Sequence, residues 1–160
     1  MTSQPDLNPT LAAALRQSTT SSCITDAQLE FPGPTIVFVN DAYCSLMNTE
    51  REDVVGKTPR IMQGPLTDRA VLDRLKASLK AGETFEGETV NYRLDGRPFI
   101  NQWRIDPIRD ETETITHYAA AQQDVTALRT FEAASKASRV IDQASRAALT
   151  VTDDPSAALE

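Results

Sequence analysis

"TFEGETVNYRLDGRPFINQWRIDPIRD", residues 84–110, contains two strand-like stretches on either side of a tight turn. Asp95 and Gly96 form that turn, and this dipeptide is a strong hairpin signal because glycine readily adopts the positive φ angles that such turns require. A looser turn at residues 110–114 leads into a third strand-like stretch, "ITHYAAAQQDV", at residues 115–125. We therefore expect three consecutive antiparallel strands in the second half of the chain.

The first half of the chain is predicted to add two shorter strands, "SSCITD" at residues 21–26 and "TIVFVN" at residues 35–40. Four short helices are expected around them, with these ranges and capping residues: 8–17 (Asn8), 40–48 (Asn40 or Asp41), 49–56 (Thr49 with Glu52 as a capping box) and 67–82 (Thr67). A longer helix is expected from residue 126 to 151. This order of elements predicts an α+β fold, in which a five-stranded antiparallel sheet carries short helices on one face and has flanking helices at both ends.

The composition argues against several classes of protein. With 160 residues and a formal net charge of -7, the chain lacks the basic surface that nucleic-acid binding needs. No apolar run approaches the roughly 18 residues of a membrane span, and no signal-peptide pattern begins the chain. The two cysteines are isolated, a single histidine leaves no His-based metal site, and no catalytic triad or phosphate loop is present. We expect a cytoplasmic protein that is not an enzyme and binds neither nucleic acid nor membranes.

Three carboxamide side chains are predicted on the apolar face of the sheet. Side chains alternate between the two faces of a strand, so Asn101 shares a face with Phe99 and Trp103. Asn91 and Gln122 lie on the apolar faces of their own strands. A buried carboxamide without a partner costs about 1–3 kcal/mol. Either the three bond to one another and to loop backbone, or they bind a flat heterocycle with mixed donors and acceptors, such as the pyrimidine side of a flavin.

Four stretches resemble the LOV subgroup of PAS domains, which are flavin-binding blue-light photoreceptors. They are "GKTPRIMQGPLTDRA" (56–70), "VNYRLDGRPFIN" (90–101), "PIRD" (107–110) and "YAAAQQDVT" (118–126). The resemblance implies a PAS core at residues 22–126, between an N-terminal flanking segment with a short helix (1–21) and a C-terminal helix and tail (127–160). The family's signature resembles GRNCRFLQG, and its cysteine bonds covalently to the flavin under light. Here the stretch reads "GKTPRIMQG", so Pro59 stands at the position of the photoactive cysteine.

The resemblance also implies which residues would bind the flavin. It assigns the pyrimidine edge to Asn91 and Asn101, contacts with the phosphate arm and ring to Arg60 and Gln63, and the signal-passing contact near flavin N5 to Gln122. Three further positions depart from the family pattern: Thr58 replaces an asparagine, Lys76 an arginine, and Trp103 a smaller apolar residue. The implied cofactor is FMN, with FAD or riboflavin as alternatives, or none if the pocket is empty.

Because proline has no reactive atom, Pro59 leaves three outcomes open. The domain binds flavin and responds by photoreduction alone, it uses another thiol, or it has lost the flavin and serves as a PAS interaction module. The candidate for another thiol is Cys23, whose position in the family is aliphatic and close to the reactive part of the ring. The alternative is that Cys23 is a small hydrophobic core residue. Trp103 likewise either crowds a flavin pocket or fills an empty core.

The predicted C-terminal helix carries an alanine-rich seam with alternating spacings of three and four residues. Its members are Ala127, Ala134, Ala137, Ile141, Ala144, Ala148 and Val151. Such a seam allows close helix approach but buries little area per residue. It either docks on the domain's own sheet or pairs with a second subunit. The expected partners are a second copy of the chain, through the flanking helices, and a downstream signalling protein.

Overall fold

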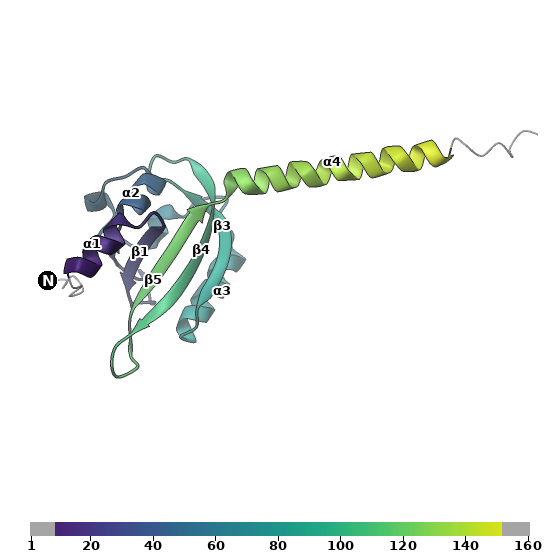
Figure 1. Cartoon of the computed structure of the whole chain (residues 1–160). Coiled ribbons are helices and arrows are strands. Elements are labelled where there is room, and N and C mark those ends of the chain that lie inside the picture. Colours follow the sequence, from purple (N-terminus) through teal and green to yellow (C-terminus); the bar gives the residue numbers. More distant parts are fainter. Residues whose placement is uncertain (1–8, 152–160) are drawn as a thin grey trace, which may run out of the picture. The chain divides into compact units, whose positions relative to one another are not determined.

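The structure is a computed structural model that describes residues 9–151. The chain divides into two compact units, one ending at Val125 and the other beginning at Thr126 (Figure 1). The first unit contains the sheet and the short helices, and the second contains the long helix α4. The two units are described separately below.

The first unit is built on one five-stranded antiparallel sheet with the strand order β2-β1-β5-β4-β3 (Figure 1). The strands are β1 (Ser21–Asp26), β2 (Ile36–Val39), β3 (Phe85–Tyr92), β4 (Pro98–Arg109) and β5 (Ile115–Asp124). Gly96 has a φ of 86° in the turn between β3 and β4, as the hairpin prediction requires. The first strand pairs with the last, and this pairing places Cys23 opposite Ala120. The predicted sheet is confirmed, and the pairing of β1 with the central strand β5 brings the two halves of the chain together.

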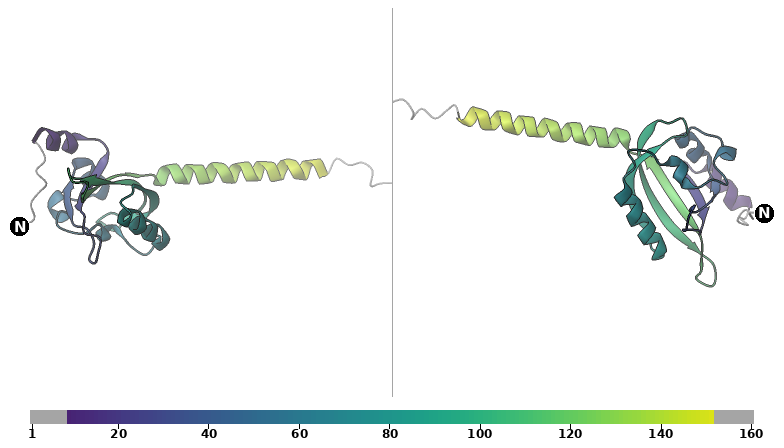
Figure 2. Two further views of the ribbon diagram at one scale, coloured as in Figure 1. Left: turned by 90° about the horizontal axis from the view of Figure 1, so that it is seen from below. Right: turned by 180° about the vertical axis from the view of Figure 1, so that it is seen from behind.

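The helical elements of this unit are short, as predicted. They are α1 (Pro9–Gln17), α2 (Asp41–Met47), η1 (Arg51–Asp53), η2 (Pro59–Met62) and α3 (Arg69–Lys80). Helix α2 packs against β1, and α3 packs against β3. Figure 2 shows α2 and α3 on the same side of the sheet. The predicted Asn8 cap of α1 lies outside the described residues.

Two predicted helix caps are wrong. The Thr49–Glu52 capping box does not form, because residues 51–53 make a 3-10 turn without a side-chain cap. The cap of α3 is Asp68, whose carboxylate accepts from the Ala70 N–H at 2.8 Å. The predicted cap, Thr67, instead accepts a hydrogen bond from the Gly64 N–H and donates one to the carbonyl of Val90 in β3. The Thr67 hydroxyl therefore bonds to the sheet, although the local sequence predicts that it caps α3.

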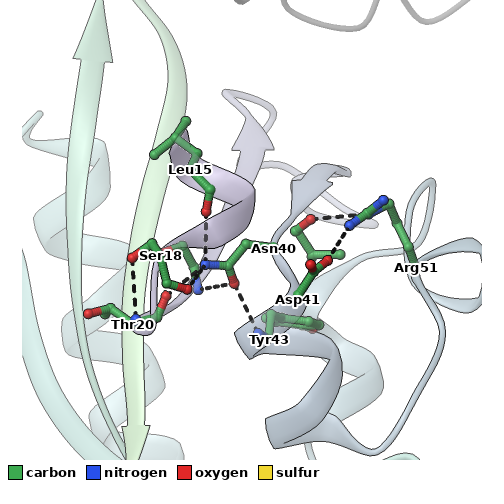
Figure 3. A network of polar contacts seen from close by, with 9 residues as sticks. Leu15, Ser18, Thr20, Asn40, Asp41, Tyr43 and Arg51 are labelled. Atoms are coloured by element: carbon green, nitrogen blue, oxygen red, sulfur yellow. Dashed lines mark hydrogen bonds and ion pairs between the residues drawn. The ribbon is translucent and has the colours of Figure 1, made fainter. Parts of the chain in front are cut away.

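Asn40, one of the two predicted caps of α2, is completely buried and joins three elements (Figure 3). Its Oδ1 accepts hydrogen bonds from the N–H groups of Tyr43 and Ser22, both at 2.9 Å. Its Nδ2 lies within hydrogen-bond distance of the carbonyl oxygens of Leu15, Ser18 and Thr20. The side chain therefore starts α2 and also anchors the segment between α1 and β1.

The second unit consists of α4, which spans Thr126–Val151 and confirms the predicted boundaries. Its large apolar side chains are exposed: Leu128, Phe131, Val140, Ile141 and Leu149. None of the described helices combines the length and apolar character needed to cross a bilayer.

Candidate functional site

A cavity of about 330 Å³ lies inside the first unit. Small-molecule sites in proteins are typically about 300–1,000 Å³, so the volume fits a ligand of moderate size. Its lining residues come from β1, the β1–β2 loop, η2, α3 and strands β3 to β5. They are Cys23, Thr25, Leu29, Gly33, Pro34, Pro59, Arg60, Met62, Gln63, Arg69, Leu72, Asp73, Leu75, Lys76, Asn91, Asn101, Trp103, Ile105, Tyr118, Ala120 and Gln122.

The three predicted carboxamides meet on the sheet side of this cavity. Asn101 is 1% exposed, and its Nδ2 lies 2.9 Å from Asn91 Oδ1 and 3.0 Å from Gln122 Oε1. The Nδ2 of Asn91 donates to the Met62 carbonyl at 3.2 Å. The three side chains thus bond to one another and to loop backbone, as one of the two alternatives anticipated.

These internal bonds leave two buried polar atoms without a partner among the described residues. They are Asn101 Oδ1, an acceptor, and Gln122 Nε2, a donor. Each unmet buried polar group costs about 1–3 kcal/mol, so a folded protein seldom keeps two in one cavity unless something else satisfies them. An unmet acceptor and an unmet donor on two hydrogen-bonded side chains suit a ligand edge that itself carries both kinds of group.

The apolar wall of the cavity includes Trp103, which is 7% exposed. Its ring lies 5.9 Å from that of Phe85, with the two planes inclined by 48°. Val71 of α3 belongs to the same buried cluster. Trp103 therefore packs in the core and also borders the cavity.

Pro59 and Cys23 both line the cavity, whereas Cys44 does not. Pro59 is the first residue of η2, where its missing N–H causes no loss of hydrogen bonding. Cys23 is buried in a cluster with Tyr43 and Met62, and burial raises the pKa of its thiol to about 12. Its thiol is therefore protonated at neutral pH and surrounded by apolar groups.

The exposed residues that line the cavity are all charged. Arg60, Arg69 and Lys76 line it together with one carboxylate, Asp73. The β1–β2 loop also contributes here, since the Arg60 guanidinium lies against Gly33. A surface ion pair between Glu30 of this loop and Lys80 of α3, 2.9 Å long, ties the loop to the helix. The hydrogen bond and charge of Lys80 lower the pKa of the Glu30 carboxyl, with a smaller contribution from Lys76.

The structure brings nearly all the predicted site residues to this cavity, and their role in cofactor binding stays a prediction. Thr58 is the exception, because it precedes η2 in an extended conformation and does not line the cavity. Sequence reasoning did not select Arg69, Asp73 or Tyr118 as site residues. Strand alternation could have found Tyr118, which is four residues before Gln122, but no local signal separates Arg69 from the other cations of α3.

Comparison with known proteins places this site in a family. The sequence profile of the PAS domain matches residues 20–127. The chain belongs to the PAS domain family. This PAS domain is 32% identical over 121 residues to a blue-light-activated histidine kinase of Brucella anthropi, a match that covers 76% of this chain and 24% of the kinase. It is 30% identical over 114 residues to phototropin-2 of Oryza sativa subsp. japonica, covering 71% of this chain and 12% of the phototropin. The PAS domain thus spans a quarter or less of these relatives.

Solved structures support the same assignment of fold. A LOV domain from the Erythrobacter litoralis EL346 blue-light activated histidine kinase has a TM-score of 0.63 at 28% identity, covering 69% of this chain and 99% of that one. A structure reported as "Flavin Analogue Sheds Light on Light-Oxygen-Voltage Domain Mechanism" has a TM-score of 0.67 at 26% identity, covering 82% and 97%. The predicted PAS fold of the LOV type is confirmed.

Proposed function

We propose that this PAS domain is a sensory module that binds a flavin, FMN in the first instance, in the 330 Å³ cavity and responds to blue light or redox state. The observation that carries the proposal is the unmet pair Asn101 Oδ1 and Gln122 Nε2. The pyrimidine side of a flavin offers both donors and acceptors, so it can satisfy both atoms at once. The blue-light receptors among the similar proteins support the same ligand.

In this proposal, different groups of cavity-lining residues bind different parts of the flavin. Asn91 and Asn101 bind and orient the ring edge, while Arg60, Gln63 and Lys76 bind the phosphate arm. When bound, the flavin supplies light absorption and electron acceptance. Trp103 and its apolar neighbours exclude water from the ring, which strengthens the hydrogen bonds of the carboxamides.

Gln122 is the residue proposed to pass the signal on. Its amide carries a donor and an acceptor, so rotation about its last bond exchanges which of them faces the ligand. Such a rotation would break the bond from Asn101 to its Oε1 and disturb the end of β5, two residues before Asp124. Because α4 begins at Thr126, the altered strand end is next to the proposed output helix in sequence. A local change in hydrogen bonding of this kind can bias a two-state element.

A flavin-free PAS interaction module is the second candidate function. The packing of Trp103 against Phe85 favours it, because a bulky side chain already occupies part of the space that a ring would need. In both candidates we propose that α4 links two copies of the chain or a downstream signalling protein. The exposed apolar side chains of α4 support this part of the proposal.

The decisive experiment measures flavin content. The purified protein, incubated with FMN and then desalted, should retain the visible absorption of oxidised flavin. The double variant Asn91→Ala/Asn101→Ala should lose at least about tenfold in affinity, because two hydrogen bonds disappear and Gln122 loses its own partner. Gln123→Ala is the matched control, since this exposed carboxamide bonds only to Gln102 among the interactions resolved here.

Two results would count against the proposal. A parent protein that stays colourless and takes up no added flavin would favour the interaction module. Equal flavin affinity in the parent and the double variant, with circular dichroism showing both to be folded, would remove the assignment of Asn91 and Asn101.

A further inference from the structure

The loop between β1 and β2 separates the cavity from solvent. Within residues 27–34, which we call the strap, Leu29, Gly33 and Pro34 line the cavity. The strap residues between Leu29 and Gly33 are exposed. A short segment that lines the cavity with some residues and meets solvent with others forms a single layer of chain between the two. The position of the strap therefore controls access to this part of the cavity.

The base of the strap is fixed to the sheet. The Asp26 N–H donates to the carbonyl of Thr35, and the Thr35 N–H donates to the Asp26 carboxylate, both at 2.9 Å. The Gln28 N–H donates to the same carboxylate at 3.1 Å. Inside the strap, the Gly33 N–H donates to the carbonyl of Glu30 at 2.7 Å. The strap thus has a fixed base and internal structure of its own, so it can move as one piece.

Beyond its base, the strap makes one hydrogen-bonded or ionic contact with another element within the described part of the chain. This contact is the ion pair of Glu30 with Lys80 of α3, whose side chains are 69% and 50% exposed. Lys76, which lines the cavity from the same helix, also attracts the Glu30 carboxylate. An exposed ion pair contributes little to stability and is screened by salt, so it breaks easily. The strap is therefore held weakly to the helix that lines the cavity.

We propose that the strap is a gate for the cavity and that the Glu30–Lys80 ion pair keeps this gate closed. When the pair breaks, the strap turns about its fixed base and opens a path between itself and α3. A ligand exchanges with solvent through local openings of this kind, which occur in the least stable parts of a fold. Because neither Glu30 nor Lys80 lines the cavity, breaking the pair changes how often the gate opens and not how tightly a ligand is held. Where the ligand is a flavin, the inference rests on the proposed function.

The first test uses the flavin-free protein and the thiol of Cys23, which is buried and lines the cavity. In a Cys44→Ala background, mass spectrometry measures how fast methyl methanethiosulfonate, a small neutral reagent, modifies Cys23. Lys80→Gln should raise this rate about threefold, the size expected for the loss of an exposed ion pair. Lys80→Arg keeps the charge and should keep the parent rate. Lys57→Gln, the matched control, removes the same charge from an exposed lysine outside the cavity and should also keep the parent rate.

The second test measures the kinetics of FMN binding by stopped-flow fluorescence. Lys80→Gln should raise the rate constants of binding and of release by the same factor of about three, because the gate opens more often in the free and in the bound protein. The dissociation constant should therefore stay within about 1.5-fold of the parent's, whereas loss of a ligand contact mainly speeds release. Lys57→Gln should change neither rate constant.

The two tests separate the gate from the proposed function. If the parent binds no flavin, the proposed function fails, and the Cys23 rates still decide whether the gate exists. If Lys80→Gln leaves the Cys23 rate unchanged, or if Lys57→Gln raises it as much, the gate is overturned. Faster FMN release without faster binding would also overturn it, because the ion pair would then hold the bound ligand. A urea midpoint of Lys80→Gln lowered enough to explain the faster Cys23 rate would assign that rate to global unfolding, with the same consequence.

Discussion

At the scale of single residues, the proposed photochemistry depends on Cys23 and Pro59, which both line the cavity. Pro59 stands in the signature stretch without a reactive atom, while Cys23 borders the cavity from β1. Burial raises the pKa of the Cys23 thiol to about 12. The nucleophilic thiolate is therefore very rare at neutral pH, and an apolar cluster surrounds the sulfur. These properties favour Cys23 as a packing residue.

Cys23→Ala tests that assignment under illumination. We expect the FMN-loaded parent, Cys23→Ala and Cys44→Ala to lose the visible flavin band at the same rate under blue light with EDTA as the added electron donor. Cys44 is the matched control because it is half-buried and lies outside the cavity. The measurement is the visible spectrum before, during and after illumination.

The opposite result has a distinct signature. Cys23 would be a photochemical nucleophile if the parent and Cys44→Ala bleached reversibly without EDTA while Cys23→Ala did not. An adduct of this kind joins the sulfur to the ring and transfers the thiol proton to it, so it needs no external electron.

At the scale of elements, Asn40 links α1, β1 and α2. Asn40→Ala removes the cap of α2 and leaves the Ser22 N–H and several carbonyl groups without this partner. We expect the free energy of unfolding to fall by about 2–4 kcal/mol, because a lost cap and newly unmet buried groups add together. Urea denaturation measures the change.

Asp41→Asn is the control for this prediction. It alters the neighbouring residue and removes only the exposed carboxylate that pairs with Arg51. Its effect should be below about 1 kcal/mol, as for other surface ion pairs. Equal losses in the two variants would mean that the buried network adds nothing beyond ordinary surface contacts.

At the scale of the whole molecule, α4 is proposed to join two copies of the chain. Its alanine-rich seam includes Ile141, which is 65% exposed, and Ala144. The double variant Ile141→Glu/Ala144→Glu should halve the mass measured by light scattering, because charges cannot be buried unpaired in a helix seam. Gln143→Glu, on a different side of the helix, should leave the mass unchanged. A monomeric parent would end the dimer proposal.

The residues that line the cavity show which parts of the site can be predicted from local sequence patterns and which cannot. Strand alternation was sufficient to place Asn91, Asn101 and Gln122 on one face, because the two-residue period of a strand is set by the backbone itself. It could not place Arg69, since four cationic residues of α3 have similar local sequence surroundings and only packing against the sheet selects the face that borders the cavity.

The sequence by itself determined the strands, the Asp95-Gly96 hairpin, the span of α4 and the carboxamide face, because each depends on backbone periodicity or on turn chemistry within a few residues. Only the tertiary structure decided how competing polar groups were used. Thr67 bonds to Val90 of β3 rather than capping α3, and Thr49 caps no helix. A hydroxyl or amide binds the partner that folding brings nearest. For Asn101 and Gln122, folding left one buried atom each without a protein partner, and that arrangement depends on β5 pairing with β4 and, across almost 100 residues of chain, with β1.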